Sequence, residues 1–138
     1  MTTQNINISK QNISGKCDLK CSYNFKYSET NLTAKNWGSL IILIPDAAKI
    51  PPVTYNQQKY NVSSIVLVSP SVHTFNGSTA AAELVIAHTP VQGGSQLAVC
   101  IPIVSSSDSS TASNLITEII QSVSSNAPAS GETANLSI

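Results

Sequence analysis

The sequence of 138 residues contains no arginine and little charge of either sign. Charged residues make up 10% of the chain, against about a quarter in typical soluble domains. Arginine is the usual bidentate reader of phosphate and guanine, so its absence argues against nucleic-acid binding. A weakly charged surface also produces little repulsion between molecules, which favours packing against neighbours.

Long hydrophobic runs are absent as well. No apolar segment approaches the roughly 18 residues of a membrane-spanning helix, so we expect no membrane span. The first residues, MTTQNINISKQNIS, are polar and lack the apolar centre of a secretory signal. The six Asn-x-Ser/Thr sequons are therefore attributed to an Asn- and Ser-rich composition and not to glycosylation.

Residues that carry metal or nucleophile chemistry are few, with three cysteines and two histidines. An odd cysteine count without a signal sequence favours reduced thiols. Cys17 and Cys21 are followed by no second Cys or His pair at finger-like spacing, so zinc binding there is a minor alternative. Cys100, in LAVCIPIV, is expected to be a small buried apolar residue. No G-x-S-x-G, P-loop or G-x-G-x-x-G motif occurs.

The lysines are unevenly placed along the chain. All seven lie between Lys10 and Lys59, whereas residues 61–138 contain four acidic residues and no lysine. The first half of the chain could present an anion-binding face, or its charges could be spread over several solvated strands. We favour the second interpretation, because the lysines form no dense cluster.

Short apolar segments predict a series of strands. CSYNFKYSE alternates, with Tyr23, Phe25 and Tyr27 on one face, and predicts a half-buried strand. WGSLIILIP, SSIVLVSP, AAAELVIAHTP and QLAVCIPIV are compact apolar runs that predict further strands. The last two flank VQGGS, where Gly93 and Gly94 tolerate positive φ, so we expect them to form an antiparallel hairpin.

One helix is expected near the C-terminus, where apolar residues recur at helical spacing. These residues are Leu115, Ile116, Ile119, Ile120 and Val123. A Ser or Thr near 110–111 would cap the helix, and residues 126–128 would end it. Strands followed by one helix favour an α+β, mainly β fold with a mixed, mostly antiparallel sheet. We assign residues 1–9 to an N-terminal tail and residues 10–138 to one domain.

Three segments carry a resemblance to a known family. AAAELVIAHTP resembles the zinc-binding strand of the α-carbonic anhydrases, Ala-Glu-Leu-His-Leu-Val-His-Trp. SVHTFNG is similar to the Ser-Glu-His segment that precedes that strand, and QLAVCIPIV is similar to the Leu-Ala-Val strand that follows it. The resemblance covers most of the chain but only about half of a family domain. It implies that residues 10–138 form a partial α-carbonic anhydrase-like domain with an incomplete sheet.

The resemblance also assigns site positions. The zinc histidines of the family fall at Val66, Val68 and Val85, which have no donor atoms. Because a catalytic zinc needs three imidazoles and the chain has two histidines, we expect no metal, no cofactor and no catalytic residue.

The other matched positions are interpreted as vestigial. Glu83 matches a glutamate that supports a ligand histidine, and it is expected to pair with a lysine or with backbone amides. His73 and His88 match histidines of the family that are not metal ligands. Both are expected to be locally hydrogen-bonded polar residues without an acidic partner.

Within the family, the sequence is similar to carbonic anhydrase-like proteins of large double-stranded DNA viruses, some of which are virion components. This implies a non-catalytic minor capsid or virion protein, made in the host cytoplasm, whose partners are other virion proteins. Open sheet edges would favour such contacts. The alternative is a virion-surface adhesin that binds host glycosaminoglycans through Lys10, Lys16, Lys20 and Lys26. An active carbonic anhydrase is a distant third interpretation.

Overall fold

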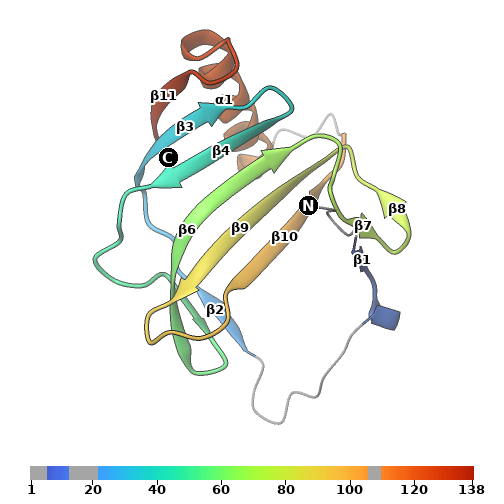
Figure 1. Ribbon diagram of the computed structural model, residues 1–138, viewed down its shortest axis with the longest axis vertical. Helices are drawn as coiled ribbons and strands as arrows, with labels where there is room; N and C mark the ends of the chain where they lie inside the picture. The colour runs from blue at the N-terminus through green and yellow to red at the C-terminus, as the bar shows by residue number, and fades with distance from the viewer. Residues whose placement is uncertain (1–5, 13–21, 106–109) are drawn as a thin grey trace.

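The computed structural model describes residues 6–12, 22–105 and 110–138. The elements are β1 (Asn7–Ile8), η1 (Lys10–Asn12), β2 (Tyr23–Phe25), β3 (Asn31–Asn36), β4 (Leu40–Pro45), β5 (Val53–Tyr55), β6 (Gln58–Val68), β7 (Thr74–Phe75), β8 (Ser78–Thr79), β9 (Ala82–Pro90), β10 (Leu97–Ile103), α1 (Thr111–Asn126) and β11 (Thr133–Ser137). Figure 1 shows α1 lying against β11 and β3 at one end of a twisted sheet.

The main sheet has the strand order β10-β9-β6-β4-β3-β11, and all of these neighbours are antiparallel. β5 pairs with β6, and β2 pairs with β5. The central strands are rich in Ile, Val and Leu, whose side chains favour extended backbone and pack on both faces. Within the described residues, β10 and β11 each have one strand neighbour, so both are open edges.

The hydrophobic core lies between α1 and one face of this sheet. The helix begins after Ser110, whose side chain accepts a hydrogen bond from a first-turn amide. Ile119 and Val123 are 2% and 3% exposed and belong to one buried cluster with Leu32 and Leu43. Full burial of a side chain of this size contributes roughly 1.5–3 kcal/mol. The core therefore fixes α1 to the β3 and β4 end of the sheet.

A second, smaller sheet has the order β1-β7-β8. Asn76 and Gly77, with φ of 50° and 81°, make the tight turn between β7 and β8, a position where Asn-Gly is favoured. β1 pairs with β7 in parallel, although it lies in the segment assigned to the N-terminal tail. The side-chain oxygen of Asn7 accepts hydrogen bonds from the Thr74 hydroxyl and the Gly77 amide, at 3.0 and 2.9 Å. These contacts attach β1 to the β7–β8 turn.

The expected fold class is confirmed: the chain is mainly β, with a mixed, mostly antiparallel arrangement and one helix near the C-terminus. The β9–β10 hairpin and α1 are also where the sequence predicts them.

The aromatic segment differs from the predicted half-buried strand, because β2 ends at Phe25 and the Phe25 side chain is 62% exposed. Its ring instead lies 5.2 Å from that of Tyr23 and 5.6 Å from that of Tyr27. In the described part of the chain, no helix is long and apolar enough to cross a membrane.

Candidate functional site

Glu83 is a fully buried carboxylate on the face of β9 opposite to α1. Its neighbour Leu84 packs against the core under α1, and successive strand residues point to opposite faces. Glu83 Oε2 accepts hydrogen bonds from the backbone amides of Val72 and His73, at 2.8 and 3.0 Å. Oε1 lies 2.6 Å from Nδ1 of His73. Both oxygens therefore have partners, which is the condition for burying a carboxylate at tolerable cost.

The loop before β7 holds His73 over this carboxylate. The Ser71 hydroxyl donates to the carbonyl oxygen of His73 at 2.7 Å and accepts from the amide of Ala80 at 2.9 Å. The Ser71 amide also donates to the Ala80 carbonyl oxygen at 3.1 Å. These contacts close the loop on itself and aim the amides of Val72 and His73 at Glu83.

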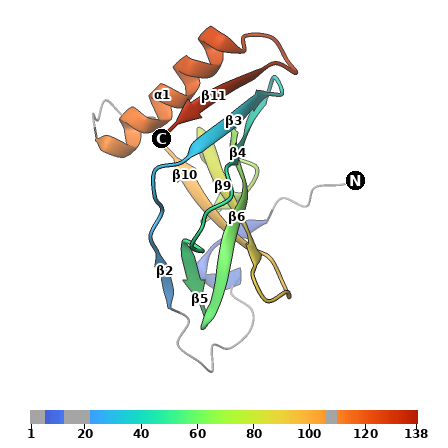
Figure 2. The ribbon, with the colours of Figure 1, turned by 90° about the vertical axis from the view of Figure 1, so that its left-hand side faces the viewer.

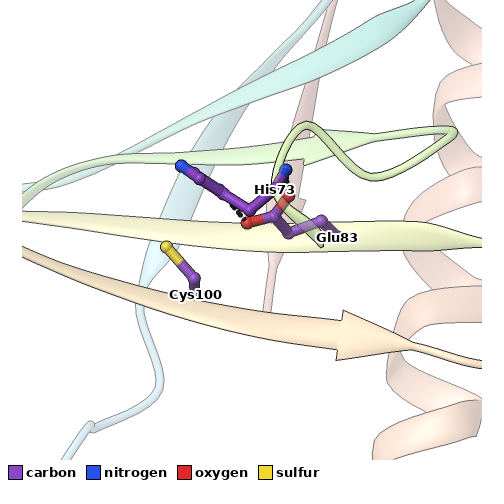
Figure 3. A group of neighbouring side chains, drawn as sticks. All are labelled: His73, Glu83 and Cys100. Atoms are coloured by element: carbon purple, nitrogen blue, oxygen red, sulfur yellow. Dashed lines mark hydrogen bonds and ion pairs between the residues drawn. The ribbon is translucent and has the colours of Figure 1, made fainter. Parts of the chain in front are cut away.

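Cys100 on β10 completes the cluster. It lies opposite Val85, two residues from Glu83 on the same face of the sheet. Candidate ligand atoms of His73, Glu83 and Cys100 all lie within 4.8 Å of one another (Figure 3). Burial, together with the charge of Glu83 and a hydrogen bond to it, raises the pKa of the Cys100 thiol to about 11. Cys100 is thus half-buried and polar in its contacts, not the apolar core residue that the sequence suggests.

The electrostatics of Glu83 reflect two opposing effects. Burial by itself would raise the pKa of Glu83, because the charged form loses its hydration. The backbone and side-chain hydrogen bonds and the charge of His73, followed by the Val72 amide, outweigh burial and hold the pKa of Glu83 below its usual value. Glu83 is therefore ionised at neutral pH. Of its two expected partners, backbone amides are observed, and no lysine among the described residues pairs with it. His73 does have an acidic partner, contrary to expectation.

The three valines that the sequence resemblance aligns with zinc ligands lie on the same face as Glu83. Val66 is directly opposite Val85, and Val68 is directly opposite Glu83, in the β6–β9 pairing. Positions that face each other across two strands share a face of the sheet, as do positions two apart on one strand. All three side chains are half-buried, so methyl groups cover this part of the surface.

His88 occupies a separate environment on the α1 side of the sheet. It is fully buried, its Nδ1 donates to the Leu97 carbonyl oxygen at 3.2 Å, and its Nε2 accepts from the Tyr27 hydroxyl at 2.9 Å. The Tyr27 hydroxyl is in turn 2.7 Å from that of Tyr23. Burial lowers the pKa of His88, so the ring is neutral at physiological pH. His88 is thus hydrogen-bonded to residues of β10 and of the segment after β2, and it shares no site with His73.

An open cavity of about 860 Å³ lies on the α1 side of the sheet. Leu84 and Ile86 of β9 form one wall, and Ile116 and Ile119 of α1 form another. Figure 2 shows α1 and β2 on the same side of the sheet. Because Leu84 and Glu83 point to opposite faces, the cavity is separate from the His73–Glu83–Cys100 cluster.

The lysines of the glycan hypothesis are only partly placed. Lys10 lies in η1, and Lys26 follows β2 and lines the cavity; both are exposed. Lys16 and Lys20 lie outside the described residues, as do Cys17 and Cys21.

The sheet and its helix form an α-carbonic anhydrase-like fold. The chain is similar to the α-carbonic anhydrase of Photobacterium profundum, with a TM-score of 0.70 and 18% identity over 96% of this chain. It is also similar to a dioscorin complexed with ascorbate (TM-score 0.68, 17% identity, 98% of this chain) and to the Thermovibrio ammonificans α-carbonic anhydrase (0.69, 14%, 95%). It covers 55%, 54% and 53% of those chains, and so spans about half their length. No family model and no curated protein matches the sequence.

This fold raises the question of a catalytic zinc ion. A carbonic anhydrase centre of three imidazoles needs more histidines than the two that the sequence contains. These two, His73 and His88, lie on opposite faces of β9, and the ligand positions implied by the resemblance hold valine. The residues present therefore do not fit a three-histidine zinc centre.

Proposed function

We propose that the protein is a non-catalytic structural component of a large DNA virus particle, a minor capsid or other virion protein that acts through protein contacts. The observation that supports this proposal is an apolar surface at the three positions where the resemblance expects zinc ligands. Val66 and Val85 face each other there, and Val68 faces Glu83. Methyl groups can neither hold a metal ion nor activate water. We therefore infer that the domain acts by binding other proteins through its surface.

The surface supports an assembly role. Several large apolar side chains are exposed, among them Phe25 at 62%, Ile50 at 80% and Val104 at 72%. The open edges β10 and β11 offer unpaired backbone groups to a partner strand, and the α1-side cavity offers an apolar recess. The low charge of the chain reduces repulsion between packed copies. The viral assignment itself rests on the resemblance of the sequence.

Location in purified virus particles tests the structural role directly. Quantitative mass spectrometry of intact particles should find a fixed copy number of the chain relative to the major capsid protein. Cross-linking of the same particles should join it to capsid or other virion proteins. Detection in infected cytoplasm together with absence from particles would contradict the proposal.

A catalytic assay tests the other half of the proposal. With zinc supplied in excess, the purified protein should hydrate CO₂ no faster than buffer containing the same zinc concentration. A zinc-dependent rate above that background, lost on addition of a chelator, would show that the protein is an enzyme.

The glycan-binding alternative predicts a different result. It requires binding to heparin or chondroitin sulfate that weakens with salt and is lost when Lys10, Lys16, Lys20 and Lys26 are changed to Gln. A matched variant with Lys49→Gln and Lys59→Gln controls for general loss of positive charge. Equal binding by both variants, or none by the parent protein, disfavours adhesion.

A further inference from the structure

The cluster of His73, Glu83 and Cys100 brings together three kinds of metal-ligating atom. An imidazole nitrogen comes from the loop before β7, a carboxylate oxygen from β9 and a sulfur from β10. In Figure 3 the Cys100 side chain projects from its strand toward the space beside the His73 ring and the Glu83 carboxylate. The candidate atoms all lie within 4.8 Å of one another, a spacing that small adjustments can close around one ion.

We propose that His73, Glu83 and Cys100 bind a single divalent cation of the zinc type. Nitrogen, sulfur and oxygen donors in one site suit zinc, whereas magnesium and calcium prefer oxygen donors alone. Three protein ligands leave one tetrahedral position for water. Its ligands are not the three valine positions, although Val85 lies directly opposite Cys100 and two residues from Glu83.

The carboxylate is already oriented for such a role. Its Oε2 is held by two backbone amides, which leaves Oε1 to face the other donors. Fixing a ligand by hydrogen bonds to its second atom is the usual way in which proteins position metal-binding side chains. Glu83 would therefore bind through Oε1 alone while its backbone contacts remain in place.

The His73 ring has to move a short distance. Its Nδ1 is 2.6 Å from Glu83 Oε1, a hydrogen-bond distance. Two ligands on one tetrahedral zinc, with bonds of about 2.0–2.1 Å, are separated by roughly 3.3 Å. His73 lies in a loop with its side chain 20% exposed, so it can make this adjustment while β9 and β10 stay fixed.

The charges balance when the ion binds. The Cys100 thiol forms a bond from sulfur to the metal and releases its proton to solvent. His73 would bind the ion through one unprotonated ring nitrogen, and a proton displaced from that nitrogen goes to the other ring nitrogen or to solvent. A dication with one thiolate and one carboxylate has zero net charge, which a half-buried site accommodates at low cost.

Cobalt(II) binding tests the site, because a thiolate ligand produces an ultraviolet charge-transfer band. The parent protein for the test carries Cys17→Ser and Cys21→Ser, so Cys100 is its one thiol. Titration should give one cobalt ion per chain with that band, and zinc should displace it. A chain that binds no cobalt with this band would overturn the proposal.

Two variants of that parent protein separate metal binding from a structural role. Cys100→Ser preserves a hydrogen-bond donor to Glu83 but should abolish the charge-transfer band. His73→Gln should weaken cobalt binding by at least the roughly 10- to 100-fold typical for loss of a supporting residue. His88→Gln, which changes the histidine on the other face, should bind cobalt as the parent does. An unaltered titration of Cys100→Ser, with circular dichroism showing it folded, would refute the assignment.

The outcome is independent of the proposed structural function. A metal-bound protein without CO₂ hydration activity supports both proposals. Zinc-dependent hydration refutes the non-catalytic role alone, and failure to bind metal refutes this site alone.

Discussion

Val66 on β6 and Val85 on β9 lie directly opposite each other, on the face of the sheet that carries Glu83. Val68 lies opposite Glu83 itself, so the three valines and the carboxylate form a compact group across two strands. Side chains directly opposite each other on antiparallel strands have Cβ atoms about 4.5–5.5 Å apart. The strand register thus brings together the three positions where the resemblance expects zinc histidines, and the valine side chains there have no donor atom.

Histidines at the three valine positions should therefore create zinc binding. The variant carries Val66→His, Val68→His and Val85→His together with Cys100→Ser, which removes the cluster thiol. Zinc at about 100 times its dissociation constant should stabilise this variant by about 2.7 kcal/mol, since the ion binds the folded state alone. Thermal denaturation with and without zinc measures the effect. The Cys100→Ser protein with its valines intact is the control, and equal responses of the two would show that these positions do not converge on an ion.

Glu83→Gln should destabilise the protein by about 1–3 kcal/mol, because the backbone amides of Val72 and His73 and the His73 ring lose a charged acceptor. Glu118→Gln, an exposed change of the same chemistry on α1, should stay within about 0.5 kcal/mol of the parent. Chemical denaturation at neutral pH compares the two. A similar loss in both variants would mean that the contacts of Glu83 contribute little.

Glu83 should also make the fold acid-sensitive. Its pKa is lower in the folded protein than its ordinary value of 4.5, so the unfolded chain binds the proton more readily. The stabilisation by Glu83 is present above about pH 4.5 and is lost as pH falls through the lower, folded pKa. Denaturation below pH 4.5 should show a steeper fall in the parent protein than in Glu83→Gln.

Elements with a strong local signal were predictable from the sequence. The β9–β10 hairpin has two apolar strands and a Gly93–Gly94 turn, where φ is 78° and 117°. The strands β3 and β11 were missed because two of their three buried positions hold alanine, Ala34 and Ala134, which gives little hydrophobic periodicity. These two strands are stabilised by pairing with each other, a long-range contact that no local pattern encodes.

The candidate site was predictable only in part. The resemblance placed His73 and Glu83 among the family positions, but their direct contact depends on how Ser71 closes the intervening loop. Cys100 lies beside them because of the pairing register between β10 and β9. A shift of that register by one residue would place the Cys100 side chain on the other face of the sheet. The apolar residues around Cys100 in the sequence gave no indication that its side chain would contact a carboxylate.

His88 should add a second, milder acid sensitivity. Burial lowers its pKa below the ordinary 6.5, and the neutral ring donates to Leu97 while accepting from Tyr27. Below pH 6.5 the unfolded chain is protonated before the folded one, so stability falls as pH decreases from 6.5 through the folded pKa. Unfolding free energies measured between pH 7 and pH 5 should decline less in His88→Gln than in the parent. Parallel curves for the two proteins would contradict the neutral, buried state of His88.

Ile119→Ala should cost about 2–5 kcal/mol, the range for truncating a large aliphatic side chain in a packed core. Ile119 of α1 is 2% exposed and packs in the core with Leu32 and Leu43, whereas the next residue, Ile120, is 46% exposed. Ile120→Ala is thus a matched control, with the same atoms removed from the same helix and an expected change within about 0.5 kcal/mol. Urea denaturation of both variants measures the difference. Comparable losses of unfolding free energy in the two isolated variants would mean that α1 is not fixed to the sheet through Ile119. A loss of stability for Ile120→Ala that occurs in intact particles alone would indicate that a partner covers the exposed face of α1.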